Sequence, residues 1–294
     1  MIAEIVRRQQ FFTILFLPFP PPTKNNHIIS IMSTILPAPL TSFLGRDRET
    51  ATLCQLLSRQ VRLVTITGPG GVGKTSLALA VAHAVQDSFA GGVFFVSLAP
   101  ISDPTLILPT IAHTLRLPES PDRLLFDSLK DYLHERQVLL VLDNFEQIVT
   151  AAPLLTELLS ACDGLQLLVT SREALRVRGE QEFLLSPLAK PDQPSVEDWL
   201  QCPGIALFVE RAQAVQLEFR LTSQNAAAVT EICSHLDGLP LALELAASRI
   251  KLLPPQARLD RLRDSPLQLL AGGARDLPVR QQTLRSAIKW SSGY

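Results

Sequence analysis

The sequence has 294 residues, of which 47% are hydrophobic and 19% charged, so it can bury the core of one or two domains and is not typical of a disordered chain. Its 27 basic and 28 acidic residues give a formal net charge of −1, which does not indicate a nucleic-acid or membrane-surface binder. The four cysteines lie far apart without paired spacing, which predicts a cytoplasmic protein with reduced thiols and excludes a disulfide or zinc framework.

The N-terminal stretch differs from the rest of the chain. Two arginines precede an apolar run at 11–19, which is too short to span a bilayer because a membrane helix needs about 20 residues. Pro18 interrupts the run, and no small-residue cleavage site follows it. We expect residues 1–32 to be a disordered or non-native extension, with Met32 as the natural start; a targeting segment and a structural element are the alternatives.

From residue 61 onward, short β-branched or apolar runs alternate with helical segments, which is the pattern of a parallel sheet covered by helices. The expected strands are 61–67, 93–98, 138–142, 165–170 and, at an edge of the sheet, 182–185. The helices expected between them are 76–85, 104–115, 122–135 and 151–161. After a linker punctuated by prolines only helical periodicity remains, at 205–215, 223–236, 241–252, 256–262 and 281–290.

The most specific motif follows the first expected strand, where residues 68–75 fit the phosphate-loop pattern G-x-x-x-x-G-K-[ST]. Its glycines let backbone amides approach phosphates, and the helix N-terminus adds partial positive charge. Lys74 is expected to bridge the β- and γ-phosphates, and the Thr75 hydroxyl to hold Mg²⁺. The alternative is a glycine-rich turn with a chance lysine. The residues expected to bind the nucleotide here are Gly68, Pro69, Gly70, Gly71, Val72, Gly73, Lys74, Thr75 and Ser76.

An acidic residue, Asp143, follows the apolar run at 138–142. A carboxylate at the carboxyl end of a buried strand points into the crevice where phosphates bind, so Asp143 is expected to share Mg²⁺ with Thr75. The alternative is an aspartate that begins an ordinary turn. Loop and acid together predict an α/β fold: a P-loop NTPase domain with a three-layer parallel sheet at 33–190, followed by an all-helical subdomain at 195–294.

Four further stretches occur in a fixed order along the chain. They are FLGRDRE at 43–49, LVTSRE at 168–173, GLPLAL at 238–243, and the segment 276–290. With the phosphate loop and Asp143, they resemble the STAND class of signal-transduction NTPases, specifically the NB-ARC-like branch of bacterial multidomain, helix-turn-helix type transcriptional regulators.

The resemblance implies a role for each stretch. Gly45 and Arg46 would belong to the motif that wraps the adenine, Arg172 would sense the γ-phosphate, and Pro240 would pack on the base. Residues 276–290 would begin a winged helix. Each has an alternative from the residues alone: Arg46 and Glu49 as a surface pair, Arg172 as a solvated helix-start residue, and Gly238 with Pro240 as an ordinary joint between two helices.

Two departures from the family pattern matter for activity. Where the family commonly has a second acid after the Mg²⁺-linked aspartate, this sequence has Asn144, and the nearest acid is Glu146. The chain also ends at Tyr294, where the family would continue into the winged helix, so we expect a fragment of a longer protein. The candidate catalytic residues are Lys74, Asp143, Asn144, Glu146 and Arg172.

The resemblance implies a Mg²⁺-dependent ATP/ADP-binding switch module with slow ATP hydrolysis. It also implies protein partners or self-association through the NTPase module, without membrane association. The alternative is a nucleotide-stabilised scaffold, or a truncated fragment, without meaningful turnover. A third interpretation makes residues 249–289, which carry an excess charge of +6, a DNA-binding face. Because these charges are dispersed, we expect no direct DNA contact from this chain.

Overall fold

The computed structural model describes residues 36–38, 42–118, 124–189, 199–251 and 254–264. The chain divides into two units, Met1–Met32 and Ser33–Tyr294, and every described residue belongs to the second. The predictions for residues 1–32, for the middle of the proline-punctuated linker at 190–198 and for the segment 276–290 lie outside the described residues. So does most of the basic stretch at 249–289.

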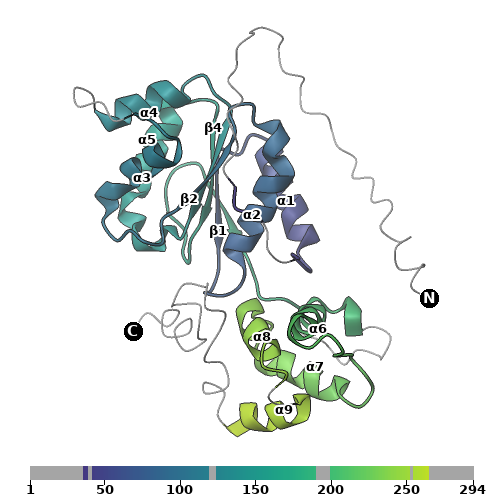
Figure 1. The fold of residues 1–294 in the computed structure, drawn as a ribbon. Helices are drawn as coiled ribbons and strands as arrows, with labels where there is room; N and C mark the ends of the chain where they lie inside the picture. Colours follow the sequence, from purple (N-terminus) through teal and green to yellow (C-terminus); the bar gives the residue numbers. More distant parts are fainter. Residues whose placement is uncertain (1–35, 39–41, 119–123, 190–198, 252–253, 265–294) are drawn as a thin grey trace. The chain divides into compact units, whose positions relative to one another are not determined.

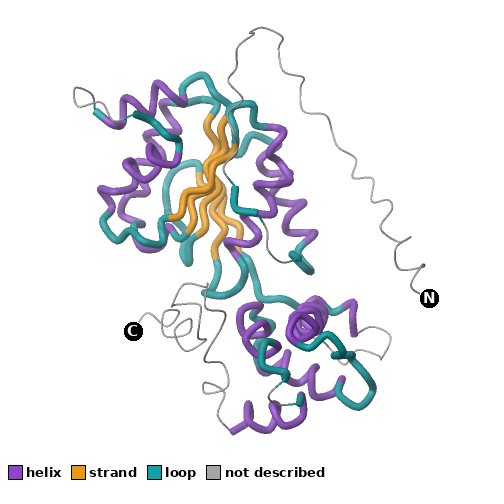
Figure 2. The backbone as a smooth tube through the Cα atoms, in the orientation of Figure 1, coloured by secondary structure: helices purple, strands orange, loops and turns teal. Residues whose placement is uncertain are grey.

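A sheet of five parallel strands in the order β2-β3-β4-β1-β5 forms the centre of the first half of this unit (Figures 1 and 2). The strands are β1 (Leu63–Thr67), β2 (Val93–Ser97), β3 (Val138–Asp143), β4 (Leu165–Thr170) and β5 (Glu180–Leu184). All residues of β1, β3 and β4 are buried, as expected of strands covered on both faces. The predicted α/β parallel sheet is confirmed, and β5 lies at an edge as the sequence indicated.

Helices cover both faces of this sheet (Figure 1). On one face α1 (Asp47–Ser58) and α2 (Lys74–Val85) pack through side chains such as Leu53 and Leu77, which are fully buried. The other face carries α3 (Ile107–Thr114), α4 (Leu125–Leu133) and α5 (Ala152–Ala161). The three expected layers are therefore present.

Short 3₁₀ turns adjust several of the predicted helix boundaries. The helix expected from residue 104 begins as a 3₁₀ turn, η3 (Pro104–Leu106), because Asp103 Oδ1 accepts the Thr105 N–H at 2.9 Å and caps that turn. The remaining 3₁₀ turns are η2 (Gln86–Ser88), η4 (Phe145–Gln147), η5 (Val149–Ala151) and η6 (Trp199–Gln201).

The second half of the unit is helical among the described residues and has a hydrophobic cluster of its own, centred on the fully buried Phe208. Its helices are α6 (Pro203–Val215), α7 (Ala226–His235), α8 (Pro240–Ala247) and α9 (Pro255–Asp264). The sequence predicted all four, but α8 ends five residues earlier than expected, and the chain continues in turns through Lys251.

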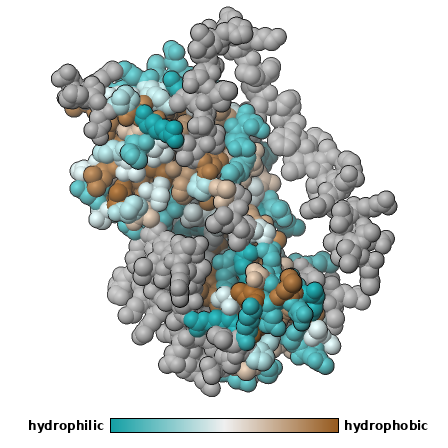
Figure 3. All heavy atoms as spheres, in the orientation of Figure 1, coloured by the Kyte–Doolittle hydropathy of each residue, from teal (hydrophilic) through white to brown (hydrophobic). Residues whose placement is uncertain are grey.

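The four cysteines are free thiols, and Cys162 and Cys233 are buried. Burial raises the pKa of the Cys233 thiol to about 12, so it stays protonated at neutral pH. Of the described helices, none is long and apolar enough to cross a membrane. Figure 3 shows apolar and polar residues interspersed over the visible face. The exposed large apolar side chains in the described ranges are Leu106, Leu124, Leu184 and Leu217.

Candidate phosphate-binding site

The phosphate loop leaves β1 at Gly68 and enters α2 at Lys74, as the motif requires. Gly68, Gly71 and Gly73 have φ values of 143°, 80° and 96°, a region in which side chains are strained. A Cβ on Gly68 would lie 2.6 Å from the Leu185 carbonyl oxygen. The glycines thus allow a backbone path that other residues cannot follow, and this path ends at the N-terminus of a 12-residue helix.

Lys74 lies over the loop that precedes it. Its Nζ donates to the carbonyl oxygens of Gly68 at 2.7 Å and Pro69 at 3.0 Å. Burial lowers the pKa of Lys74 to about 8; the positive charge of Arg172 also lowers it, while the carboxylates of Glu146 and Asp143 act in the opposite direction. The ammonium group is therefore close to three other charged groups predicted from the sequence.

The Asp143 carboxylate accepts hydrogen bonds from three side chains. Its Oδ1 accepts the Thr75 hydroxyl at 2.6 Å and the Thr170 hydroxyl at 2.7 Å, and its Oδ2 accepts the Asn144 amide at 2.7 Å. The carboxylate is buried, with 4% of the residue exposed. A carboxylate oxygen beside a hydroxyl fits Mg²⁺, which prefers oxygen ligands and takes few of them from the protein when phosphates supply the others.

Thr170 is the site residue that sequence reasoning missed. It ends β4, next to β3, and besides donating to Asp143 its hydroxyl accepts the Asn144 N–H at 3.0 Å. Asn144 has a left-handed backbone, with φ at 66°, and this conformation turns the chain sharply after β3. A hydroxyl at the carboxyl end of a central strand, one strand from Asp143, was the available signal.

Glu146 and Arg172 form an ion pair beside this cluster. Arg172 Nε lies 3.4 Å from Glu146 Oε1, and the two side chains are 23% and 9% exposed. Glu146 Oε2 is buried, and no group of the described residues forms a hydrogen bond with it. Arg172 is therefore not a solvated residue at a helix start, and both predicted residues lie at the carboxyl ends of adjacent strands.

The motif at 43–49 reaches the loop through the side chain of Arg46, which is 5% exposed. The guanidinium pairs with Glu49 Oε1 at 2.7 Å and donates to the carbonyl oxygens of Ser186 at 2.8 Å and Val72 at 3.4 Å. The surface-pair interpretation of Arg46 and Glu49 is therefore wrong. Arg46 fastens the start of α1 to the phosphate loop and to the segment after β5.

The motif at 238–243 forms the joint between α7 and α8. Gly238, with φ at 65°, follows α7, and Pro240 is the first residue of α8, as expected for a helix–helix joint. This joint also touches the loop, because the Leu241 N–H donates to the Gly71 carbonyl oxygen at 3.2 Å. Leu239 packs against the hydrophobic clusters of both halves. The role of Pro240 toward a base stays a prediction.

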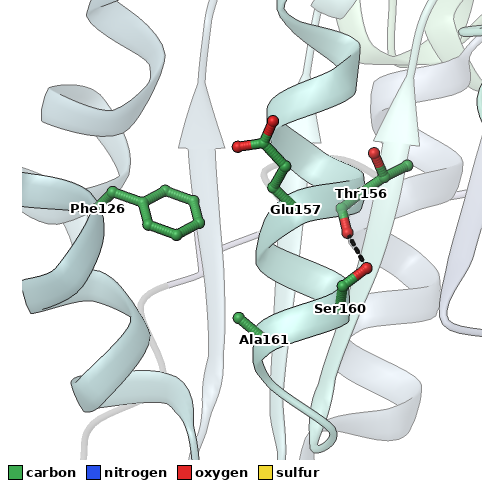
Figure 4. A pocket seen from close by; sticks show the side chains of 5 residues that line it. All are labelled: Phe126, Thr156, Glu157, Ser160 and Ala161. Carbon is green, nitrogen blue, oxygen red and sulfur yellow. Dashed lines mark hydrogen bonds between the residues drawn. The ribbon is translucent and has the colours of Figure 1, made fainter.

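A shallow groove lies elsewhere, between α4 and α5 (Figure 4). It is lined by Phe126, Thr156, Glu157, Ser160 and Ala161, none of which belongs to the motifs above. The Ser160 hydroxyl donates to the Thr156 carbonyl oxygen at 2.7 Å, so that hydroxyl is already engaged within its own helix. The groove offers no grouping of charges comparable with that around Lys74.

The sequence profile of the family described as Novel STAND NTPase 1 matches residues 38–245, which contain every motif described above except the segment 276–290. The chain belongs to this STAND NTPase family. The STAND class expected from the sequence is thereby confirmed, whereas the NB-ARC-like branch remains a prediction.

Relatives of this STAND chain include proteins named as transcriptional regulators. It is 43% identical over 236 residues to the HTH-type transcriptional regulator Rv0890c of Mycobacterium tuberculosis, matching 80% of this chain and 25% of that protein. It is 29% identical to the regulatory protein AfsR of Streptomyces coelicolor, matching 73% of this chain and 22% of that protein. The chain thus spans about a quarter of the length of these relatives.

Solved structures support the fold of this STAND chain. Cdc6p from Pyrobaculum aerophilum superimposes with a TM-score of 0.54 at 17% identity, over 85% of this chain and 74% of that chain. The Walker-type ATPase PABY2304 of Pyrococcus abyssi gives a TM-score of 0.52 at 15% identity, over 77% and 73% of the two chains. At these identities the likeness shows the P-loop ATPase fold and nothing finer.

Proposed function

We propose that this chain is the Mg²⁺-dependent ATP/ADP-binding switch module of a transcription-regulatory STAND protein, with slow ATP hydrolysis. The observation that carries the proposal is the convergence of Lys74, Thr75 and Asp143 at the end of β1 and β3. Gly45, Arg46 and Pro240 are proposed to lie around the base, and residues 68–76 around the phosphates. Protein partners or self-association through the NTPase domain would transmit the nucleotide state.

The described side chains divide the work on the nucleotide. The loop amides and the N-terminus of α2 would bind the phosphates, and Lys74 would exchange its carbonyl partners for phosphate oxygens. Thr75 and Asp143 would hold Mg²⁺, which supplies charge neutralisation on the phosphates when bound. Arg172 would contact the γ-phosphate.

A nucleotide-stabilised scaffold is the second candidate, and one observation favours it. The Asn144 amide is held by Asp143 Oδ2, and Glu146 lies beside Arg172. Both side chains are thus engaged by other residues of the protein. Binding is therefore supported by more contacts than turnover is, and the two need separate tests.

Adenine nucleotide is expected to stabilise the full chain. A ligand at about 100 times its dissociation constant adds about 2.7 kcal/mol to the free energy of unfolding, which corresponds to a rise in Tm of about 5–10 °C. Thermal unfolding with ATP or ADP measures this, and EDTA should reduce the shift because Thr75 and Asp143 then hold no Mg²⁺. A folded chain whose Tm neither nucleotide changes would refute nucleotide binding.

Turnover is expected to be well below the ~10 s⁻¹ of a median enzyme, since Asn144 cannot accept a proton from water. A single-turnover assay with radiolabelled ATP on the wild type, Glu146→Gln and Asn144→Asp measures it. If Glu146 is the base, Glu146→Gln abolishes product formation while ATP still binds, and if Asn144 limits the rate, Asn144→Asp raises it. Wild-type turnover near the median rate would contradict the slow switch, and absence of product would favour the scaffold.

A further inference from the structure

The two residues that precede Glu146 are anchored in the fold. Phe145 before it is fully buried in the core of the α3–α5 face. The Asn144 N–H is bonded to Thr170 on β4. Since β3 and β4 pair in parallel up to Leu142 and Val169, the turn that carries Glu146 and the residue Arg172 emerge at the same edge of the sheet. Their proximity follows from the fold, not from flexible surface side chains.

The contact between Arg172 Nε and Glu146 Oε1 is too long for a strong hydrogen bond. Its 3.4 Å separation exceeds the roughly 2.7–2.9 Å of charge-assisted hydrogen bonds between N–H donors and carboxylates. The second oxygen of the Glu146 carboxylate, Oε2, is buried and has no hydrogen-bond partner in the part of the chain that the structure describes. A carboxylate in this condition is poorly compensated, because burial removes water and no donor among the described residues replaces it at Oε2. The pair is therefore electrostatic, and another anion can compete with it.

The anion that would compete is the terminal phosphate of a nucleoside triphosphate. Lys74, which is expected to bridge the β- and γ-phosphates, is close enough to both Glu146 and Arg172 for their charges to act on it. A γ-phosphate bound by Lys74 and Arg172 would thus meet Glu146 at the same guanidinium. A nucleoside diphosphate brings no such group and would leave the ion pair undisturbed.

We infer that Glu146 sets the preference of this site for ATP over ADP by competing with the γ-phosphate for Arg172. The inference rests on the proposed nucleotide binding and assigns Glu146 a specificity role whether or not it acts in hydrolysis. With a diphosphate bound, Glu146 stays paired with Arg172. With a triphosphate bound, the Arg172 guanidinium pairs with the γ-phosphate instead, and the Glu146 carboxylate loses this partner.

A double-mutant cycle on the full chain tests this competition. Dissociation constants for ADP and for an ATP analogue with a non-hydrolysable β,γ bond are measured with Mg²⁺ in the wild type, Glu146→Gln, Arg172→Ala and the double variant. Glu146→Gln is expected to raise the affinity for the analogue about fivefold and to change the affinity for ADP less than about twofold. In the Arg172→Ala background the same change is expected to have no effect on either ligand.

A matched control separates competition from simple repulsion. Glu173 is an exposed carboxylate next to Arg172 in sequence, so Glu173→Gln removes the same charge without removing the ion pair. It should leave the ATP-to-ADP ratio unchanged. Where Arg172→Ala does not fold, as judged by thermal unfolding, Arg172→Gln takes its place.

Two results would overturn the inference while leaving nucleotide binding intact. One is an ATP-to-ADP ratio that Glu146→Gln does not change. The other is an increase in affinity for the ATP analogue on Glu146→Gln that is equally large with and without Arg172, which would show direct repulsion between Glu146 and the phosphate. Failure of the wild type to bind either ligand would instead refute the proposed function, and the inference with it.

Discussion

Lys74→Ala is expected to lower the affinity of the chain for ATP and ADP by about tenfold to 150-fold, because it removes a charge-assisted contact to phosphate worth about 1.5–3 kcal/mol. The fold should survive the change. The wild-type Lys74 is half-buried, and burial lowers its pKa to about 8, so its removal relieves a desolvation cost while losing two hydrogen bonds to the loop. Calorimetric titration with Mg²⁺ and nucleotide measures the affinity.

The matched control is Lys130→Ala, which removes an exposed lysine on α4, outside the motifs of the site. The affinity of Lys130→Ala for ATP and ADP should equal that of the wild type. If Lys74→Ala binds nucleotide as tightly as this control, Lys74 has been assigned the wrong role, and the loop would have to act through its backbone amides alone.

Gly68→Ala is expected to destabilise the chain more than any other single methyl addition in the loop. The backbone conformation, with φ at 143°, costs about 1–3 kcal/mol for a residue with a side chain. The added Cβ would also lie 2.6 Å from the Leu185 carbonyl oxygen, and relieving such overpacking costs a further ~1–3 kcal/mol. Thermal unfolding measures the loss, and nucleotide affinity should fall because the loop must move.

Gly179→Ala provides the comparison, since Gly179 also has a positive φ, at 78°, but a Cβ there would have no atom within 4 Å. It should cost only the backbone contribution and leave nucleotide affinity unchanged. Equal losses of stability in the two variants would mean that the close approach of Leu185, just after β5, does not constrain the loop.

The sequence predicted the parts of this molecule that depend on local patterns. The apolar run before Asp143 correctly predicted a buried central strand, and the glycine spacing at 68–73 correctly predicted the loop between β1 and α2. Lys74, Thr75 and Asp143 were assigned together because the phosphate-loop chemistry requires them; the fold bonds Thr75 to Asp143 and places Lys74 near enough for the Asp143 charge to act on it.

What the sequence left open depends on long-range contacts. Arg46 has the same local sequence whether it lies on the surface or, as here, beneath the loop with Ser186, which is 140 positions away in the sequence. Thr170 lies within the motif at 168–173, but no role was assigned to it, and only the pairing of β3 with β4 makes it a partner of Asp143. Likewise, the pairing of Glu146 with Arg172 follows from sheet order, which residue spacing does not encode.

The sharing of the Asp143 carboxylate has a consequence for how this site tolerates sequence change. Its Oδ1 serves two hydroxyls, from Thr75 and Thr170, and its Oδ2 serves Asn144. The effects of substitutions at these positions should not add, because each loss alters the same acceptor for the others. A change of Asn144 to an acid therefore places a second carboxylate against Asp143, and its acceptance depends on which hydroxyls still neutralise the first. Substitutions at these four positions are then expected to occur together during evolution. Which replacement is tolerated at one position should depend on which of the other three has already changed.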